Sequence, residues 1–247
     1  MSSSKQYRSE ATIIMTFHNE GILAHKSLLG FQRMRDYMHS KNKGLDLICV
    51  LDSPAESTKN IIQNFISKFG NENDQIVEVA FKSLAASRNS GIDLVKTDYV
   101  GFLDGDDFLS KNWVYEALKH QKKIRNRVLC FPKYVISFGK HNATQIIKPS
   151  SGIPIPQLIN THYWNSASFG HISIYRDLFY NEIINRNNKF VFEDWDFNLR
   201  CIAQKIEIEP VNNTYLFYRR KHNSMLLEHV ALQSLTPPSA FFDTIHH

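Results

Sequence analysis

The chain has 247 residues, which is enough for one large domain or two small ones. With 43% hydrophobic and 12% aromatic residues it can bury a sizeable core, which excludes a disordered protein. The formal net charge of +5 is too small an excess for a dedicated nucleic-acid-binding protein, and it favours anionic small molecules or loose contact with an anionic membrane face.

Strand-like and helix-like segments alternate through the first hundred residues. Buried strands are predicted from their apolar, β-branched runs, and helices from the apolar positions between them. Ser57 or Thr58 is expected to cap the second helix. The strands are expected at 11–17, 45–52, 75–81 and 99–103, and the helices at 22–39, 57–69 and 83–95.

This strand–helix order predicts an α/β fold with a mostly parallel central sheet, right-handed crossovers and helices on both faces. In such sheets, ligands bind outside the carboxyl ends of the strands. The second half is less regular. It is expected to hold a loop at 148–157, a strand at 171–175, a helix at 192–205 and a last strand at 214–220.

The cysteines and the lengths of the apolar runs indicate in which part of the cell the protein lies. Cys49, Cys130 and Cys201 lie in apolar runs without metal-ligand spacing, and they are interpreted as buried thiols in a reducing environment. No apolar stretch reaches the ~18 residues that a membrane span needs, and the N-terminus lacks a signal-peptide core. The expected location is cytoplasmic, with peripheral contact to the inner face of the membrane left open.

Three carboxylates follow the fourth predicted strand in the sequence DGDD. Asp104 and Asp106 are expected to point the same way, with Gly105 allowing a sharp turn between them. Oxygen ligands in this arrangement suit Mg²⁺ or Mn²⁺ shared with a diphosphate. The alternative is a solvated acidic loop in which Asp107 or Ser110 caps the next helix, and capping is the role expected for Asp107.

Five stretches together resemble family 2 glycosyltransferases with the GT-A fold. In chain order they are TIIMTFHNEG, LDLICVLDSPAEST, SLAASRNSGI, YVGFLDGDD with its D-x-D motif, and FVFEDWDFNLR. The resemblance implies a Rossmann-like sheet and an acceptor-side subregion. It implies one GT-A domain at 1–235, with a nucleotide-sugar-binding half at about 11–107 and an acceptor-binding half at about 108–235. Residues 236–247 are expected to form a C-terminal tail.

The resemblance implies a uridine pocket at the ends of the first two strands. Thr16 and the turn formed by His18, Asn19 and Glu20 would line it. Asp52 would accept the N3–H of uracil. The family more often has Tyr where His18 stands and a second acidic residue beside the one that reads the base.

The resemblance also implies contacts to the diphosphate and the metal. Arg88 would lie on the diphosphate or the rim of the base, since a guanidinium matches phosphate oxygens in a fork geometry. Asp104 would contact the ribose and the metal, Asp106 would ligate the metal directly, and His222 would complete the site. Gly91 is expected to allow close packing of its helix on a strand.

On the acceptor side, Asp194 is the candidate catalytic base that takes the proton of the attacking hydroxyl. Glu193 would hydrogen-bond the acceptor. Trp164 could stack on an acceptor sugar or lie in the core. Asp196 is expected to pair with Arg200 at i,i+4 spacing.

These roles predict an inverting, metal-dependent transferase that moves a monosaccharide from a UDP-linked donor to a glycan or lipid-linked glycan hydroxyl in surface polysaccharide synthesis. The alternatives are a sugar nucleotidyltransferase, for which the expected glycine-rich loop is missing, and a non-catalytic glycan-binding module. No nucleic-acid partner is expected. The basic run at 119–127 is interpreted as a solvated helix face, with anionic lipid contact left open.

Overall fold

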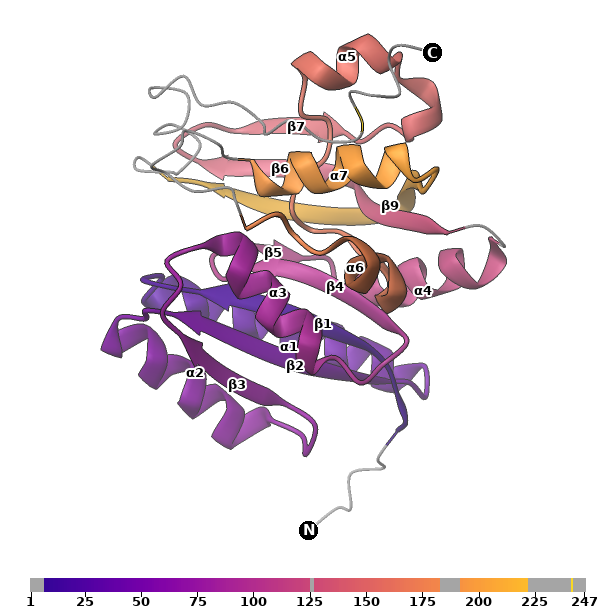
Figure 1. Ribbon diagram of the computed structural model, residues 1–247. Helices are drawn as coiled ribbons and strands as arrows, with labels where there is room; N and C mark the ends of the chain where they lie inside the picture. Colours follow the sequence, from indigo (N-terminus) through magenta and orange to yellow (C-terminus); the bar gives the residue numbers. More distant parts are fainter. Residues whose placement is uncertain (1–6, 125–126, 183–191, 222–240, 242–247) are drawn as a thin grey trace.

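The computed structural model describes residues 7–124, 127–182, 192–221 and 241. The first half alternates strand and helix as expected, and the predicted parallel strands are confirmed (Figure 1). The elements are β1 (Ser9–Phe17), α1 (Ile22–Ser40), β2 (Gly44–Asp52), α2 (Glu56–Phe69), β3 (Gln75–Val79), α3 (Leu84–Leu94) and β4 (Tyr99–Asp104).

The second half adds shorter elements and two long strands. They are β5 (Phe108–Leu109), α4 (Trp113–Lys123), β6 (Val128–Gly139), β7 (Ala143–Ile146), the 3₁₀ turn η1 (Ser150–Gly152), α5 (Ile155–Asn160), β8 (Phe169–His171), α6 (Ile172–Leu178), α7 (Glu193–Ala203) and β9 (Glu207–Arg220). The predicted tail, apart from the buried Phe241, lies outside the described residues.

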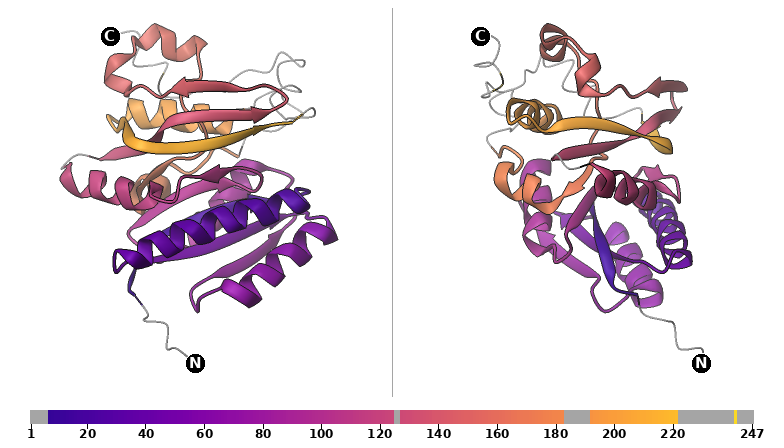
Figure 2. Two further views of the ribbon diagram at one scale, coloured as in Figure 1. Left: turned by 180° about the vertical axis from the view of Figure 1, so that it is seen from behind. Right: turned by 90° about the vertical axis from the view of Figure 1, so that its right-hand side faces the viewer.

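One sheet runs through both halves, in the order β3-β2-β1-β4-β8-β6-β9-β5, with β7 added on β6. The first four strands are parallel, and all nine residues of β2 are buried, as expected for a strand covered on both faces. Strand β8 lies antiparallel between β4 and β6 and joins the two halves. Helix α1 covers one face of the parallel strands and α3 the other (Figures 1 and 2). This confirms the predicted α/β fold.

The three cysteines are buried free thiols, as predicted. Burial raises the pKa of Cys201 to about 12, so this thiol is protonated and packs as an apolar group. Within the described ranges, no helix is both long enough and apolar enough to cross a bilayer.

Two local predictions are wrong, and in each case a competing contact explains the outcome. The predicted strand at 171–175 is mostly helix α6, because the His171 side chain accepts the Ser173 N–H and caps a helix start. Helix α2 begins after Ala55 without a side-chain cap. The Thr58 hydroxyl instead accepts the N–H of Gly21, 2.9 Å away in the turn before α1.

Gly91 allows α3 to pack closely on the sheet, as predicted. A Cβ atom at Gly91 would lie 2.7 Å from Cγ2 of Ile14 and 3.2 Å from Cγ2 of Val50. These side chains belong to β1 and β2, whose carboxyl ends carry candidate site residues. The close approach of α3 therefore positions the helix that carries Arg88.

Gly91→Ala should destabilise the fold by about 1–3 kcal/mol, because the added methyl overpacks α3 against β1. Gly152→Ala is the control, since the nearest atom to its Cβ would be 3.9 Å away. Urea unfolding followed by circular dichroism would measure both. Equal unfolding free energies for the two variants would contradict the packing argument.

Candidate active site

The carboxyl ends of β1, β2 and β4 place three predicted site residues on one edge of the sheet. Thr16 lies opposite Asp104 in the register of β1 and β4, and its hydroxyl donates to Oδ1 of Asp104 at 3.5 Å. Asp52 ends β2, the other neighbour of β1. Parallel pairing therefore brings together residues that are 36 to 88 positions apart, as the strand order predicted.

The loop after β4 is held tightly against β1. The Gly105 N–H donates to the Thr16 carbonyl at 3.0 Å, and a Cβ at Gly105 would lie 2.8 Å from that oxygen and 2.4 Å from Cδ1 of Phe17. Only glycine fits this approach without displacement. The side chains of Asp104 and Asp106 remain 27% and 18% exposed, so both carboxylates reach the rim.

Asp107 does not cap α4, contrary to the prediction. Its buried carboxylate accepts the backbone N–H of Arg219 in β9 at 2.7 Å, and α4 follows Asn112 without a side-chain cap. Burial, with the charges of Asp106 and Asp104, raises the pKa of Asp107 well above its usual range. The Ser110 hydroxyl likewise accepts a β9 N–H. Both residues fasten the acidic loop to β9.

Arg88 is the centre of the site and lies beneath the rim. Its side chain is only 1% exposed, with one terminal nitrogen 2.7 Å from Oε1 of Glu193 and the other 3.0 Å from Oδ1 of Asp104. Burial opposes the guanidinium charge, but the two carboxylates outweigh this effect and raise the Arg88 pKa. The guanidinium also lies over the Tyr180 ring. Arg88 thus joins the D-x-D strand to the start of α7.

The start of α7 presents two carboxylates. The pKa of Glu193 is raised, because the effect of burial outweighs the opposite effect of the nearby Arg88 charge. Asp194 is 19% exposed, and its Oδ1 accepts the Trp195 N–H at 2.9 Å. The Asp194 Oδ2 lies 3.7 Å from Nε2 of His162, whose ring stacks on the Trp195 indole with centroids 5.4 Å apart. The other predicted pair of this helix, Asp196 with Arg200, is confirmed at 2.8 Å.

Two residues at the site were not predicted from the sequence. His162 contacts Asp194, and the Ser166 hydroxyl donates to Oδ2 of Asp104 at 2.8 Å. Both belong to the aromatic and polar segment at 161–171. The sequence signal for both is the set of polar side chains that this segment carries beside its aromatic rings.

The turn after β1 is packed on the segment after β2. Nδ1 of His18 lies 2.6 Å from the Asp52 carbonyl, and Oδ1 of Asn19 accepts the Ala55 N–H at 3.0 Å. The Glu20 carboxylate accepts the His18 N–H, and burial, with the charge of Asp106, raises its pKa. The exposed rings and amides of this turn border the same edge as the D-x-D loop.

Asp52 stabilises the N-terminus of α3. Its two oxygens accept from the backbone N–H groups of Lys82 and Ser83 at 2.9 and 3.0 Å and from the hydroxyls of Ser87 and Ser53 at 2.9 and 3.2 Å. Burial alone would raise the pKa of Asp52, but these donors together lower it. All four acceptor positions of the carboxylate are used within the protein.

Asp52→Asn should lower the free energy of unfolding at pH 7 by about 2 kcal/mol, since charge-assisted hydrogen bonds are lost. Because the folded-state pKa of Asp52 is lowered, its stabilisation is present above the ordinary Asp value and is lost as the pH falls through the folded value. The difference from wild type should therefore shrink below about pH 4. Urea unfolding at several pH values would test this, with the exposed Asp36→Asn as control.

One predicted acceptor-binding residue does not reach the described site, and one predicted metal ligand is not among the described residues. Trp164 is 2% exposed, and its indole N–H donates to the Lys148 carbonyl at 3.0 Å, so its ring lies in the core and not at the surface. This is the second of the two places expected for it. His222 lies outside the described residues.

The D-x-D carboxylates have the chemistry that a hard divalent cation needs. Asp104 and Asp106 offer partly exposed carboxylate oxygens, and Oδ2 of Asp106 already attracts the Lys221 ammonium at 2.5 Å. Among the described residues, no three His, Cys, Asp or Glu side chains form a ready-made metal cluster. The donors fit Mg²⁺ or Mn²⁺ that takes its other ligands from phosphate and water.

Arg88→Met should lower the free energy of unfolding by about 3–5 kcal/mol, because it leaves Asp104 and Glu193 without their buried counter-charge. Adding Glu193→Gln should recover part of this loss, since it removes one uncompensated charge. Arg127→Met, which breaks an exposed pair, is the control and should cost less than about 1 kcal/mol. Strictly additive losses in the double variant would refute the bridge.

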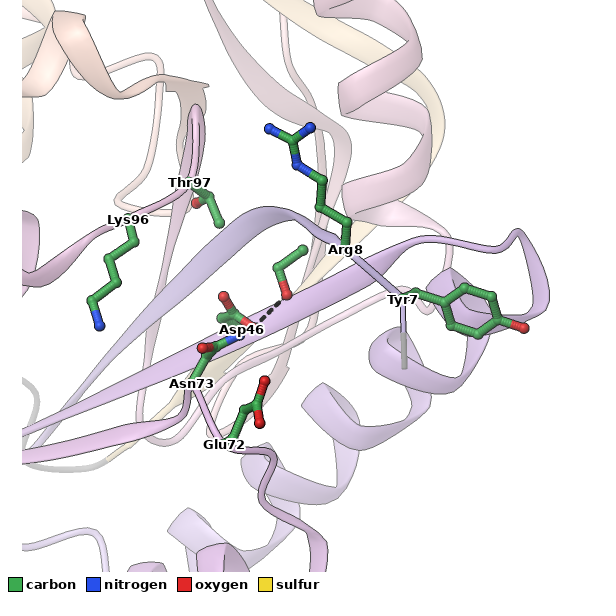
Figure 3. Close-up of a pocket in the computed structure, with 8 residues that line it drawn as sticks. Tyr7, Arg8, Asp46, Glu72, Asn73, Lys96 and Thr97 are labelled. Carbon is green, nitrogen blue, oxygen red and sulfur yellow. Dashed lines mark hydrogen bonds between the residues drawn. The ribbon is translucent and has the colours of Figure 1, made fainter. Parts of the chain in front are cut away.

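A separate hollow of about 420 Å³ lies at the opposite edge of the parallel strands (Figure 3). It holds none of the predicted site residues. Its walls come from the starts of β1 and β2 and from the segments before β3 and β4, where Ser9 donates to Asp46. It is lined by Tyr7, Arg8, Ser9, Asp46, Glu72, Asn73, Lys96 and Thr97.

The fold is that of the GT-A glycosyltransferases. Residues 1–349 of S. aureus TarS in complex with UDP-GlcNAc superpose with a TM-score of 0.68 at 13% identity, covering 88% of this chain and 60% of that TarS chain. The mannosyltransferase PcManGT from Pyrobaculum calidifontis, in complex with GDP-Man and Mn²⁺, superposes with a TM-score of 0.64 at 12% identity, covering 98% of this chain and 69% of its own.

The family model described as glycosyl transferase family 2 matches residues 12–184. The chain therefore belongs to glycosyltransferase family 2. It is 21% identical over 78% of its length to a cholesterol galactosyltransferase of Borreliella burgdorferi, and 28% identical over 43% to an uncharacterized glycosyltransferase of Haemophilus influenzae. It spans 56% and 40%, respectively, of the lengths of these relatives.

Proposed function

We propose that the protein transfers a monosaccharide, with inversion, from a UDP-linked donor to a hydroxyl of a glycan or lipid-linked glycan, with Mg²⁺ or Mn²⁺ bound. Family membership supports sugar transfer. A UDP-sugar in one structural neighbour, and a nucleotide sugar with Mn²⁺ in another, support the donor class and the metal. The name of one relative, a cholesterol galactosyltransferase, supports a lipid acceptor. Surface polysaccharide synthesis on the cytoplasmic side is proposed from the family resemblance of the sequence.

The observation that carries the proposal is the Arg88 bridge. It fixes Asp104, which ends the donor-side strand β4, relative to Glu193, which precedes the candidate base. Transfer needs a fixed position of the base relative to the donor's anomeric carbon. A misplacement of about 1 Å can lower the rate by about two orders of magnitude. A buried guanidinium held by two carboxylates supplies that rigidity.

Asp194 is proposed to accept the proton of the acceptor hydroxyl as it attacks the anomeric carbon from the side opposite the diphosphate. Its Oδ1 is oriented by the Trp195 N–H, and its Oδ2 faces His162. The transition state has oxocarbenium character, as in glycoside hydrolysis. A divalent cation bound by Asp104 and Asp106 would offset the negative charge on the departing diphosphate.

On the donor side, His18 and Asn19 are proposed to border the base. Asp52 is proposed to act there through its carbonyl contact with His18 and by holding the start of α3. For the base contact implied by the resemblance, the uracil N3–H would have to replace one of the four donors that the carboxylate already accepts. Arg88 is proposed to act on the donor through Asp104 and not by direct phosphate contact, since its guanidinium is buried and its two terminal nitrogens are paired with Glu193 and Asp104.

Asp194→Asn should lower kcat by about 10³-fold, because a general base contributes 10²–10⁴. UDP affinity in the presence of Mn²⁺ should be nearly unchanged. Asp106→Ala should weaken metal-dependent UDP binding, and Asp93→Asn, an exposed change on α3, should affect neither. Thermal shifts with UDP and Mn²⁺ measure binding by mass action, and release of UDP from a nucleotide-sugar panel measures turnover.

Near-normal turnover by Asp194→Asn would rule out its role as base. If neither UDP nor any nucleotide sugar raised the melting temperature, with or without metal, the proposed donor class would be wrong.

A further inference from the structure

The charge of the chain is distributed unevenly. Residues 117–176 contain no Asp or Glu, although the chain has 24 acidic residues, and they contain nine of its 29 Lys and Arg. This stretch forms most of α4, all of β6, β7, α5 and β8, and most of α6. This part of the acceptor half therefore contributes no acidic side chain.

The basic run at 119–127 is largely engaged by acidic side chains from outside it. Lys119 pairs with Glu116, Lys122 with Glu10, and Arg127 with Asp177. These pairs reduce its attraction for lipid headgroups. The basic run at 119–127 is therefore a weaker candidate for lipid contact than a second surface, which is formed by residues farther along the chain.

The edge strand β7 and the helix α5 form that surface. All four residues of β7 are exposed, and Ile146 and Ile155 are exposed by 59% and 44%. Tyr163 connects the two elements: its carbonyl accepts from Gln145 at 3.3 Å and its hydroxyl donates to Gln157 at 2.9 Å. Figures 1 and 2 show both elements at the same end of the molecule.

We define the β7–α5 face by Ile146, Ile155, Lys140 and Lys148, all of them exposed. We propose that this face docks on an anionic phospholipid bilayer. Two large apolar side chains suit the boundary between headgroups and acyl chains, and two lysines suit the anionic headgroups. No acidic residue of the stretch repels such a surface.

The position of the face explains what docking would achieve, and this part rests on the proposed function. The Trp195 indole N–H donates to the Leu158 carbonyl of α5 at 2.9 Å. Trp195 directly follows Asp194, so the candidate base is connected through one residue to the helix that carries Ile155. Docking would present a lipid-linked hydroxyl to the base. A soluble anionic polymer would gain nothing from the exposed isoleucines, which is why the bilayer is favoured.

Vesicle sedimentation tests the proposal. The protein should sediment with vesicles of phosphatidylcholine and phosphatidylglycerol, more weakly at high salt, and stay in solution with phosphatidylcholine alone. Ile146→Glu with Ile155→Glu, and separately Lys140→Ser with Lys148→Ser, should each weaken binding by roughly tenfold. Ile22→Glu, at a more exposed isoleucine (66%) on α1, is the matched control and should bind like wild type.

Melting temperatures and UDP-induced thermal shifts of the variants should equal those of the wild type, which separates lost docking from lost folding or lost donor binding. The proposal is overturned if the wild type ignores anionic vesicles or if the isoleucine variant binds them normally. It is also overturned if light scattering shows a dimer that Ile146→Glu dissociates, since β7 would then pair with a second copy. Binding to soluble polyphosphate but not to vesicles would overturn it as well.

Discussion

The arrangement of this site depends on one buried positive charge. The Arg88 guanidinium is almost fully excluded from water, and a buried charge is tolerated only when it is paired and hydrogen-bonded. Glu193 and Asp104 provide that pairing from two segments that lie far apart in the sequence. The end of β4 and the start of α7 are therefore fixed together by the cost of leaving this charge uncompensated.

Other polar contacts extend this constraint to the rest of the rim. Thr16 and Ser166 donate to the carboxylate that Arg88 holds, and the acidic loop is tied to β9 through Asp107. An active site of this kind works by preorganisation, because charges that are already in place need no rearrangement during the reaction. These side-chain contacts add to the one continuous sheet, which already joins the donor half to the acceptor half.

Local sequence patterns correctly predicted those features that residue type or spacing alone can set. The parallel strands, the packing role of Gly91 and the Asp196–Arg200 pair on one helix are confirmed. The predicted caps were wrong, because Asp107 and Thr58 found partners in β9 and in the turn before α1. A hydroxyl or carboxylate takes the nearest unsatisfied donor in space, which a sequence window does not reveal.

Residue type and short spacing were enough to predict the order of strands and helices in the first half, the acidic loop after the fourth strand and the family resemblance. Three features became visible in the folded chain alone: Arg88 faces inward, Trp164 is buried and His162 lies beside Asp194. The partners of Arg88, for example, lie as far as 105 positions away. Burial and pairing depend on such distant segments, so they are set by packing and not by local pattern.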